Sequence, residues 1–151
     1  SLFLAILILT FGMIGSGKPL YHLTFVEDLA AGIILAGETP KASGQVYTIG
    51  GEEYLPLEEL VKLVAKILDK PVSKLHIPLF PVYAAAFMCE IICKPLKIDP
   101  PLYRRRLDFF TKDRAFDITK AKTDLGYSPK VSLQEGLTRT AEWYKEKGML
   151  A

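Results

Sequence analysis

The stretch with the most suggestive chemistry is FGMIGSGKPLYH, residues 11–22. Gly12, followed after four residues by Gly17 and Lys18, nearly reproduces the GxxxxGK[ST] loop that binds nucleotide phosphates. Position 19 is proline, which lacks the hydroxyl that ligates Mg²⁺ and the amide N–H that opens the following helix. The next residues, LYHLTFV, are rich in aromatic and β-branched side chains and predict a strand. We therefore predict a glycine-rich turn before a strand, not a nucleotide-binding loop.

Two cysteines, Cys89 and Cys93, are the next candidates for chemistry. They lie four residues apart in an expected helix with no histidine nearby, which favours two buried thiols over a metal site. Two cysteines also build no disulfide framework, so we expect a reducing, cytoplasmic compartment. The net charge of +2, from 19 basic and 17 acidic residues, gives no basis for a nucleic-acid partner.

The 151 residues are enough for one domain with a sizeable core, and strands that alternate with helices indicate the α/β class. Hydrophobic periodicity and turn residues predict helices at 26–37, 56–68, 79–93, 99–110, 119–125 and 132–148, and strands at 20–26, 45–51, 73–78 and 114–118. Asp28 and Asp117 are expected to cap their helices, and Ser132 with Glu135 matches the capping box. The apolar runs at 2–11 and 79–93 are shorter than the ~20 residues that span a bilayer. For 79–93 we favour packing within the protein over peripheral membrane contact.

Three segments together resemble a known family: LYHLTFVEDLAAGIILA, then GQVYTIGG, then FDITKAKTDLGYSPKVSLQEGLTRTAEWY. They resemble the C-terminal half of extended short-chain dehydrogenases/reductases, the NAD-dependent epimerase/dehydratase and 3β-hydroxysteroid dehydrogenase group. The resemblance implies that residues 1–151 are the C-terminal substrate-binding portion of an extended Rossmann-fold dehydrogenase, with the N-terminal dinucleotide-binding half absent. It also implies hydride transfer with NAD(P), which the missing half would mainly bind.

The family's catalytic pair, a tyrosine and a lysine spaced as YxxxK, does not occur in this chain. None of the seven tyrosines has a lysine four residues later, and neither GxGxxG nor GxxGxxG is present. We therefore expect catalytic and cofactor-binding residues upstream of Ser1, none within the chain, and a chain that is a fragment.

The resemblance also bears on the substrate. Nucleotide-sugar members carry an arginine at the position matched by Tyr21, and an arginine and an aspartate at those matched by Leu107 and Phe110. A one-residue gap would bring Arg106 into register. We therefore predict a hydrophobic alcohol or ketone, steroid-like or flavonoid-like, as the substrate of the parent enzyme. The substrate-pocket candidates are Tyr21, His76, Ile77, Pro78, Arg106 and Phe110. A solvated surface is the alternative for Arg106, and ordinary packing is the alternative for the others.

Two alternative functions stay open. One is a portion of a nucleotide-sugar epimerase or dehydratase, and the other is a non-catalytic small-molecule binding or scaffold domain. For the hydrophobic alcohol or ketone and for the nucleotide sugar alike, the partner is a small-molecule substrate. The family also implies that the parent enzyme is a homodimer.

Overall fold

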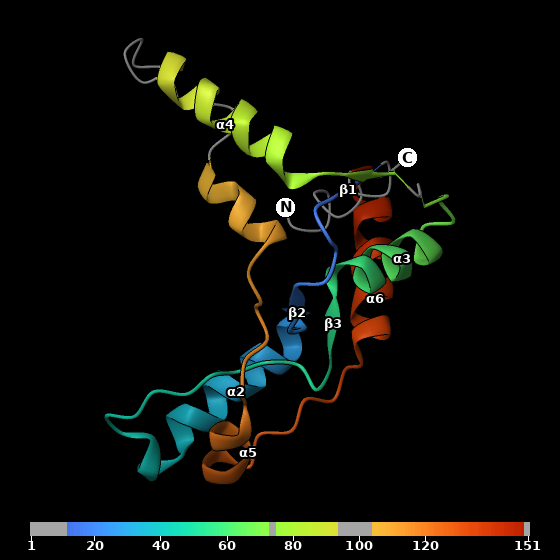
Figure 1. The fold of residues 1–151 in the computed structure, drawn as a ribbon. Helices are drawn as coiled ribbons and strands as arrows, with labels where there is room; N and C mark the ends of the chain where they lie inside the picture. The colour runs from blue at the N-terminus through green and yellow to red at the C-terminus, as the bar shows by residue number, and fades with distance from the viewer. Residues whose placement is uncertain (1–11, 73–74, 94–103, 150–151) are drawn as a thin grey trace. The chain divides into compact units, whose positions relative to one another are not determined.

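A computed structural model describes residues 12–72, 75–93 and 104–149, which form helices and short strands (Figure 1). The chain divides into two compact units, each built from two separate stretches of sequence. Unit 1 comprises the described parts of Ser1–Pro19 and Pro56–Asp113, and unit 2 those of Leu20–Leu55 and Arg114–Ala151. The mixture of helix and strand agrees with the predicted α/β class.

Unit 1 is organised around a short parallel pair of strands and one strongly amphipathic helix. Strand β1, Met13–Ile14, pairs in parallel with β4, His76–Ile77. Helix α3, Leu57–Ile67, begins after Pro56, and its apolar side chains recur with the helical period. The largest fully buried side chains belong to that helix face: Leu57, Leu60, Val61 and Val64.

The other two elements of unit 1 are α4, Leu79–Cys93, and the 3-10 helix η2, Arg104–Phe110. Helix α4 matches its predicted bounds, but it is apolar on all sides and buries only Ala86 and Glu90. Its two cysteines are half-buried, with their Sγ atoms 3.9 Å apart, so the prediction of buried thiols is wrong. Within the described ranges, no helix has the length and hydropathy needed to cross a bilayer. Residues 99–103 of the predicted helix 99–110 lie outside the described residues.

Unit 2 pairs β2, Leu20–His22, with β3, Tyr54–Pro56, beside helices α2, Val26–Glu38, α5, Thr119–Leu125, and α6, Leu133–Glu146. The 3-10 helix η1, Pro40–Ala42, follows α2. A core of Ile118, Ala121, Leu125 and Tyr127 packs against Leu35, Ala36, Ala42, Tyr47 and Ile49.

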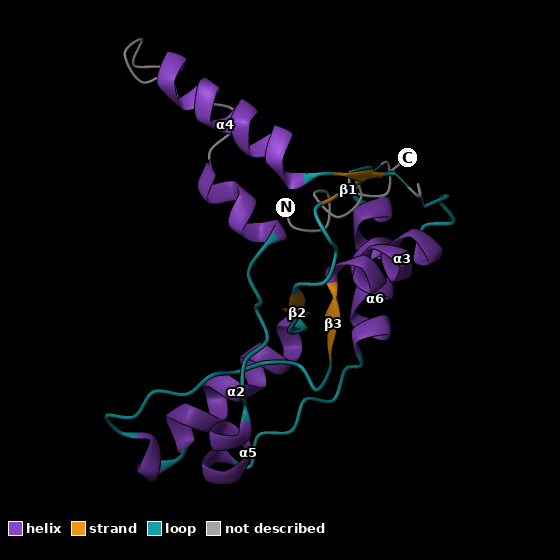
Figure 2. Cartoon of the chain, in the orientation of Figure 1, coloured by secondary structure: helices purple, strands orange, loops and turns teal. Residues whose placement is uncertain are grey.

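Two strands predicted for unit 2 do not form. Residues 45–51 are drawn as loop in Figure 2, and some of their carbonyls accept hydrogen bonds from side chains. Lys120 Nζ donates to the Val46 carbonyl and the Tyr127 hydroxyl to the Gly50 carbonyl. At 114–118 only Arg114 makes a bridge, to Tyr21.

The predicted cap of helix α6 is half present. The Ser132 hydroxyl accepts a hydrogen bond from the Glu135 backbone N–H at 3.3 Å, so Ser132 is the N-cap. The Glu135 carboxylate, however, pairs with Arg139 at 2.6 Å. Near α5, Asp117 Oδ1 accepts from the Thr119 N–H at 2.8 Å, one residue outside the N-cap.

The prediction that Asp28 caps its own helix is wrong. Helix α2 has Phe25 at its N-cap position and no side-chain cap bond. Asp28 is buried, and its two carboxylate oxygens accept hydrogen bonds from the backbone N–H groups of Lys130, at 2.9 Å, and Val131, at 3.1 Å. The carboxylate thus ties the segment before α6 to the start of α2.

Candidate functional site

The glycine-rich segment between β1 and β2 forms a turn, as predicted. Gly15 and Gly17 have φ values of +78° and +66°, which non-glycine residues rarely adopt. The Gly17 carbonyl accepts from the Glu58 N–H, and the Pro19 carbonyl from the Leu57 N–H, each at 2.9 Å.

These bonds decide whether the loop can hold a nucleotide. A phosphate-binding loop directs helix N-terminal amides at the ligand. Here the first two amides of α3, those of Leu57 and Glu58, are bonded to the loop's own carbonyls. A Cβ added at Gly17 would lie 2.9 Å from Glu58 Cβ, so loop and helix are in close contact. The loop therefore does not provide a pyrophosphate cradle for NAD(P) or ATP.

The same loop brings two of the predicted pocket residues near each other in unit 1. The Gly15 N–H donates to the Ile77 carbonyl at 2.9 Å, at the end of β4. On its other side, a Cβ added at Gly15 would lie 3.6 Å from the Phe110 carbonyl oxygen. The ring of Phe110 meets that of Phe109 edge-to-face, with centroids 5.2 Å apart. Ile77 and Phe110 therefore flank one turn.

The remaining unit 1 candidates are His76, Pro78 and Arg106. His76 is exposed on β4. The hydrogen bond and the charge of Lys62 lower the pKa of Glu58, and proximity to His76 acts in the same direction to a smaller extent. Pro78 directly follows β4. Arg106 lies within η2, and its side chain is outside what the structure describes.

Tyr21 belongs to unit 2, whereas the other five candidates belong to unit 1. Tyr21 is 3% exposed, and the Arg114 guanidinium carbon lies 5.7 Å from the centroid of its ring. Burial raises the pKa of Tyr21 above its ordinary value, an effect that the charge of Arg114 partly offsets. The phenol therefore stays protonated at neutral pH.

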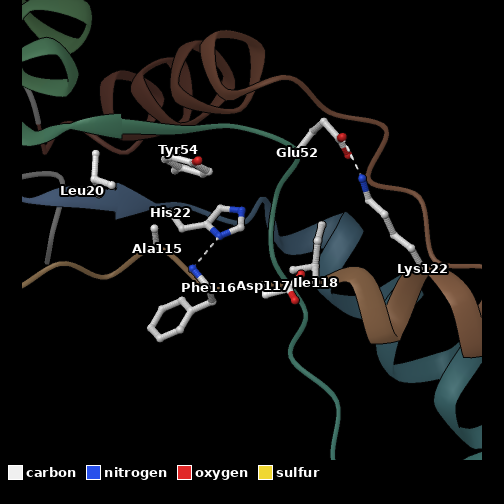
Figure 3. Close-up of a pocket in the computed structure, with 9 residues that line it drawn as sticks. All are labelled: Leu20, His22, Glu52, Tyr54, Ala115, Phe116, Asp117, Ile118 and Lys122. Atoms are coloured by element: carbon white, nitrogen blue, oxygen red, sulfur yellow. Dashed lines mark hydrogen bonds and ion pairs between the residues drawn. The ribbon is translucent and has the colours of Figure 1, made fainter.

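Unit 2 also contains a cavity that the sequence did not indicate, with a volume of about 400 Å³ (Figure 3). It lies on the face of β2 that carries Leu20 and His22, opposite to Tyr21, because successive strand residues point to opposite faces. The lining residues are Leu20, His22, Glu52, Tyr54, Ala115, Phe116, Asp117, Ile118 and Lys122.

His22 is fixed within this cavity by two backbone hydrogen bonds. Its Nδ1 accepts from the Phe116 N–H at 3.3 Å, and its Nε2 lies 2.8 Å from the Gly51 carbonyl oxygen. Since Nδ1 accepts, Nε2 must carry the hydrogen that it donates to that carbonyl. The two bonds therefore fit the tautomer with hydrogen on Nε2. The Tyr54 ring packs against it edge-on, with centroids 5.9 Å apart.

The charged end of the cavity holds two carboxylates and one ammonium. Lys122 Nζ lies 2.7 Å from Glu52 Oε1, and Figure 3 shows this pair at some distance from the His22 ring. Asp117 is exposed, and hydrogen bonds from the side chain and backbone of Thr119 hold its pKa below the ordinary value. Because Glu52 neutralises Lys122, the carboxylate of Asp117 leaves this end with one excess negative charge. Within the described parts of the chain, no group of three or more His, Cys, Asp or Glu side chains is arranged to hold a metal ion.

No known family profile matches the chain. Among curated relatives, "3beta-hydroxysteroid-dehydrogenase/decarboxylase isoform 2" of Arabidopsis thaliana is 33% identical over 142 residues, which cover 86% of this chain and 25% of the relative. The chain spans 25%, 40% and 41% of the length of three curated relatives that it matches.

Solved structures match over most of the chain. The crystal structure of gox2253 has a TM-score of 0.72 and 25% identity, over 99% of this chain and 45% of that one. The UDP-glucuronic acid 4-epimerase from Bacillus cereus, solved in complex with NAD, has a TM-score of 0.58 and 26% identity, over 90% of this chain and 34% of the epimerase.

Proposed function

Because the chain matches the C-terminal half of an extended short-chain dehydrogenase/reductase, we propose that it is the substrate-binding part of an NAD(P)-dependent oxidoreductase acting on a hydrophobic alcohol or ketone of the sterol class. The observation that carries this proposal is the 33% identity, over 86% of the chain, with a protein named as a hydroxysteroid dehydrogenase. Residues 1–151 would act as one functional region, although they form two compact units.

The side chains at the positions that anchor nucleotide sugars in the family support a sterol-like substrate. Tyr21 and Leu107 are each 3% exposed, and neither provides a positive charge for a diphosphate. Within unit 1, the apolar residues Ile77 and Phe110 lie on either side of the Gly15 turn, and both are half-buried. A fused-ring alcohol buries much apolar surface and needs few polar partners, so it would not require the charges that Tyr21 and Leu107 lack.

The cofactor would be held by residues outside this chain. NAD(P), when bound, accepts or donates the hydride that interconverts alcohol and ketone. The described residues do not offer its pyrophosphate a Gly-rich cradle, because the amides at the start of α3 are bonded to the loop. This chain would then bind and orient the substrate and exclude water from it.

A nucleotide-sugar substrate is the second candidate, and one observation favours it. The guanidinium of Arg114 lies beside Tyr21, the position where the family's diphosphate anchor would stand. A cation one strand away could replace the missing arginine, since a guanidinium suits phosphate oxygens.

Activity assays on the product of the complete reading frame that contains this chain separate these functions. A soluble 3β-hydroxysteroid with NAD or NADP should give reduced cofactor, whereas UDP-glucose and UDP-glucuronate should not be converted. Turnover of nucleotide sugars alone would overturn the sterol proposal. If Arg114→Met then abolished the turnover of nucleotide sugars, Arg114 would be identified as the residue that anchors their diphosphate. If neither hydroxysteroids nor nucleotide sugars reacted, the remaining function would be that of a non-catalytic binding or scaffold domain.

A further inference from the structure

The cavity of unit 2 is not used by the proposed substrate site. The substrate proposal places Tyr21 on one face of β2, whereas Leu20 and His22 line the cavity on the other face. The two faces are divided by the strand itself, so the cavity is open to a ligand of its own.

The charges of the lining are those of a site for cations. Glu52 and Asp117 contribute two carboxylates and Lys122 one ammonium. Lys122 lies 2.7 Å from Glu52, so its charge is already paired. The Asp117 carboxylate is therefore the unneutralised charge of the cavity.

The other end of the cavity is aromatic. Tyr54 and Phe116 are 53% and 57% exposed although both line the hollow, so much of each ring stays open to solvent. Figure 3 shows the His22 ring between Tyr54 and the Phe116 backbone. Aromatic rings attract cations through their quadrupole, and they also cover apolar groups. A volume of about 400 Å³ is that of a small-molecule site.

We propose that this cavity binds a small organic cation, an ammonium group on a short apolar body, with its charge toward Asp117 and its methyl groups against the aromatic part of the lining. An anion would face an unneutralised carboxylate. A bare metal ion would lack ligands, because the described residues provide no cluster of three donors. An ammonium with methyl groups satisfies both ends of the lining at once.

Choline and its uncharged isostere 3,3-dimethylbutan-1-ol are the probes that test this proposal, by titration of the isotope-labelled chain followed through amide NMR shifts. We expect choline to shift the amides of Tyr54, Phe116 and Asp117 and to bind at least about threefold more tightly than the alcohol, the size of an exposed cation–π contact. Added salt should weaken choline binding and leave alcohol binding unchanged.

Two variants locate the charge. Asp117→Asn keeps a side-chain oxygen that can accept a hydrogen bond from the Thr119 N–H, so the start of α5 should persist. This variant removes the negative charge and should weaken choline binding about threefold. Glu142→Gln, an exposed carboxylate on α6, makes the same charge change away from the cavity and should have no effect. The proposal is overturned if choline and the alcohol bind equally, if shifts occur outside the cavity only, or if both variants behave like the parent.

Discussion

Replacement of Asp28 by asparagine should destabilise unit 2 far more than its conservative appearance suggests. The carboxylate is 4% exposed and accepts one hydrogen bond on each oxygen, from Lys130 N–H and Val131 N–H. Asparagine has the same shape but only one accepting oxygen, and its NH₂ group must face the other backbone donor. A hydrogen bond to a charged group contributes about 1.5–3 kcal/mol, so we expect a loss of about 2–3 kcal/mol in the free energy of unfolding.

Urea unfolding followed by tryptophan fluorescence measures this loss, because the chain has one tryptophan and Trp143 lies on α6 of unit 2. The matched control is Glu27→Gln, one residue earlier in the first turn of the same helix. Glu27 pairs with Arg139 at 3.1 Å, but its side chain is 67% exposed, so we expect a loss below about 0.5 kcal/mol.

The control separates two explanations. Both substitutions remove one negative charge from the N-terminal turn of α2, so both weaken its interaction with the helix dipole equally. If Asp28→Asn and Glu27→Gln destabilised the protein to the same extent, the bonds to residues 130 and 131 would contribute nothing, and the reasoning from them would be refuted.

Two further predictions concern buried contacts. Gly17→Ala should lower the free energy of unfolding, measured by thermal denaturation, by at least about 1 kcal/mol more than Gly44→Ala does. Both glycines have positive φ, but only at Gly17 would the new methyl group lie 2.9 Å from another side-chain carbon, Glu58 Cβ. Equal losses in the two variants would contradict this prediction. Tyr127→Phe removes the 2.8 Å hydrogen bond to the Gly50 carbonyl and should cost about 1 kcal/mol at neutral pH. Burial raises the pKa of Tyr127 above 10.0, so its contribution to stability is complete below that pH and is lost as pH rises through the folded-state value. Urea titrations between neutral pH and the alkaline range should therefore show a shallower alkaline decline in Tyr127→Phe, and an identical decline would count against the assignment.

Helices could be predicted from the sequence because their pattern is local. The run at 79–93 was bounded correctly by its flanking prolines and apolar composition, and Gly126 ends α5 in a left-handed conformation, with φ of +66°. Strands were less predictable because a ladder depends on a partner. Residues 45–51 have the composition of a strand, yet their carbonyls bind the side chains of Lys120, Tyr127 and His22, which are far away in sequence.

The glycine-rich turn could be predicted because Pro19 rules out the phosphate-binding loop that its neighbours resemble. The cavity, in contrast, could not be predicted from any local pattern. His22 is held by Gly51, 29 residues away, and by Phe116, 94 residues away. Neither bond follows from the types of these residues. From the sequence, His76 is a predicted pocket residue and His22 is not. His22 lines the cavity because the bridge between Tyr21 and Arg114 brings residues 115–118 beside β2, and this pairing is tertiary.

The interleaving of the two units has a consequence for biosynthesis. Residues 20–55 of unit 2 are made before residues 56–113, which belong to unit 1, and their partners follow only from residue 114 onward. Asp28 and Lys130 are 102 residues apart, so closing unit 2 carries the entropic cost of a long loop. A ribosome that has reached the middle of residues 56–113 thus holds a nascent chain in which helix α2 has emerged without the segment that will cover it. A truncated product from that stage would lack every contact that α5 and α6 make, and it would be a substrate for chaperones and proteases.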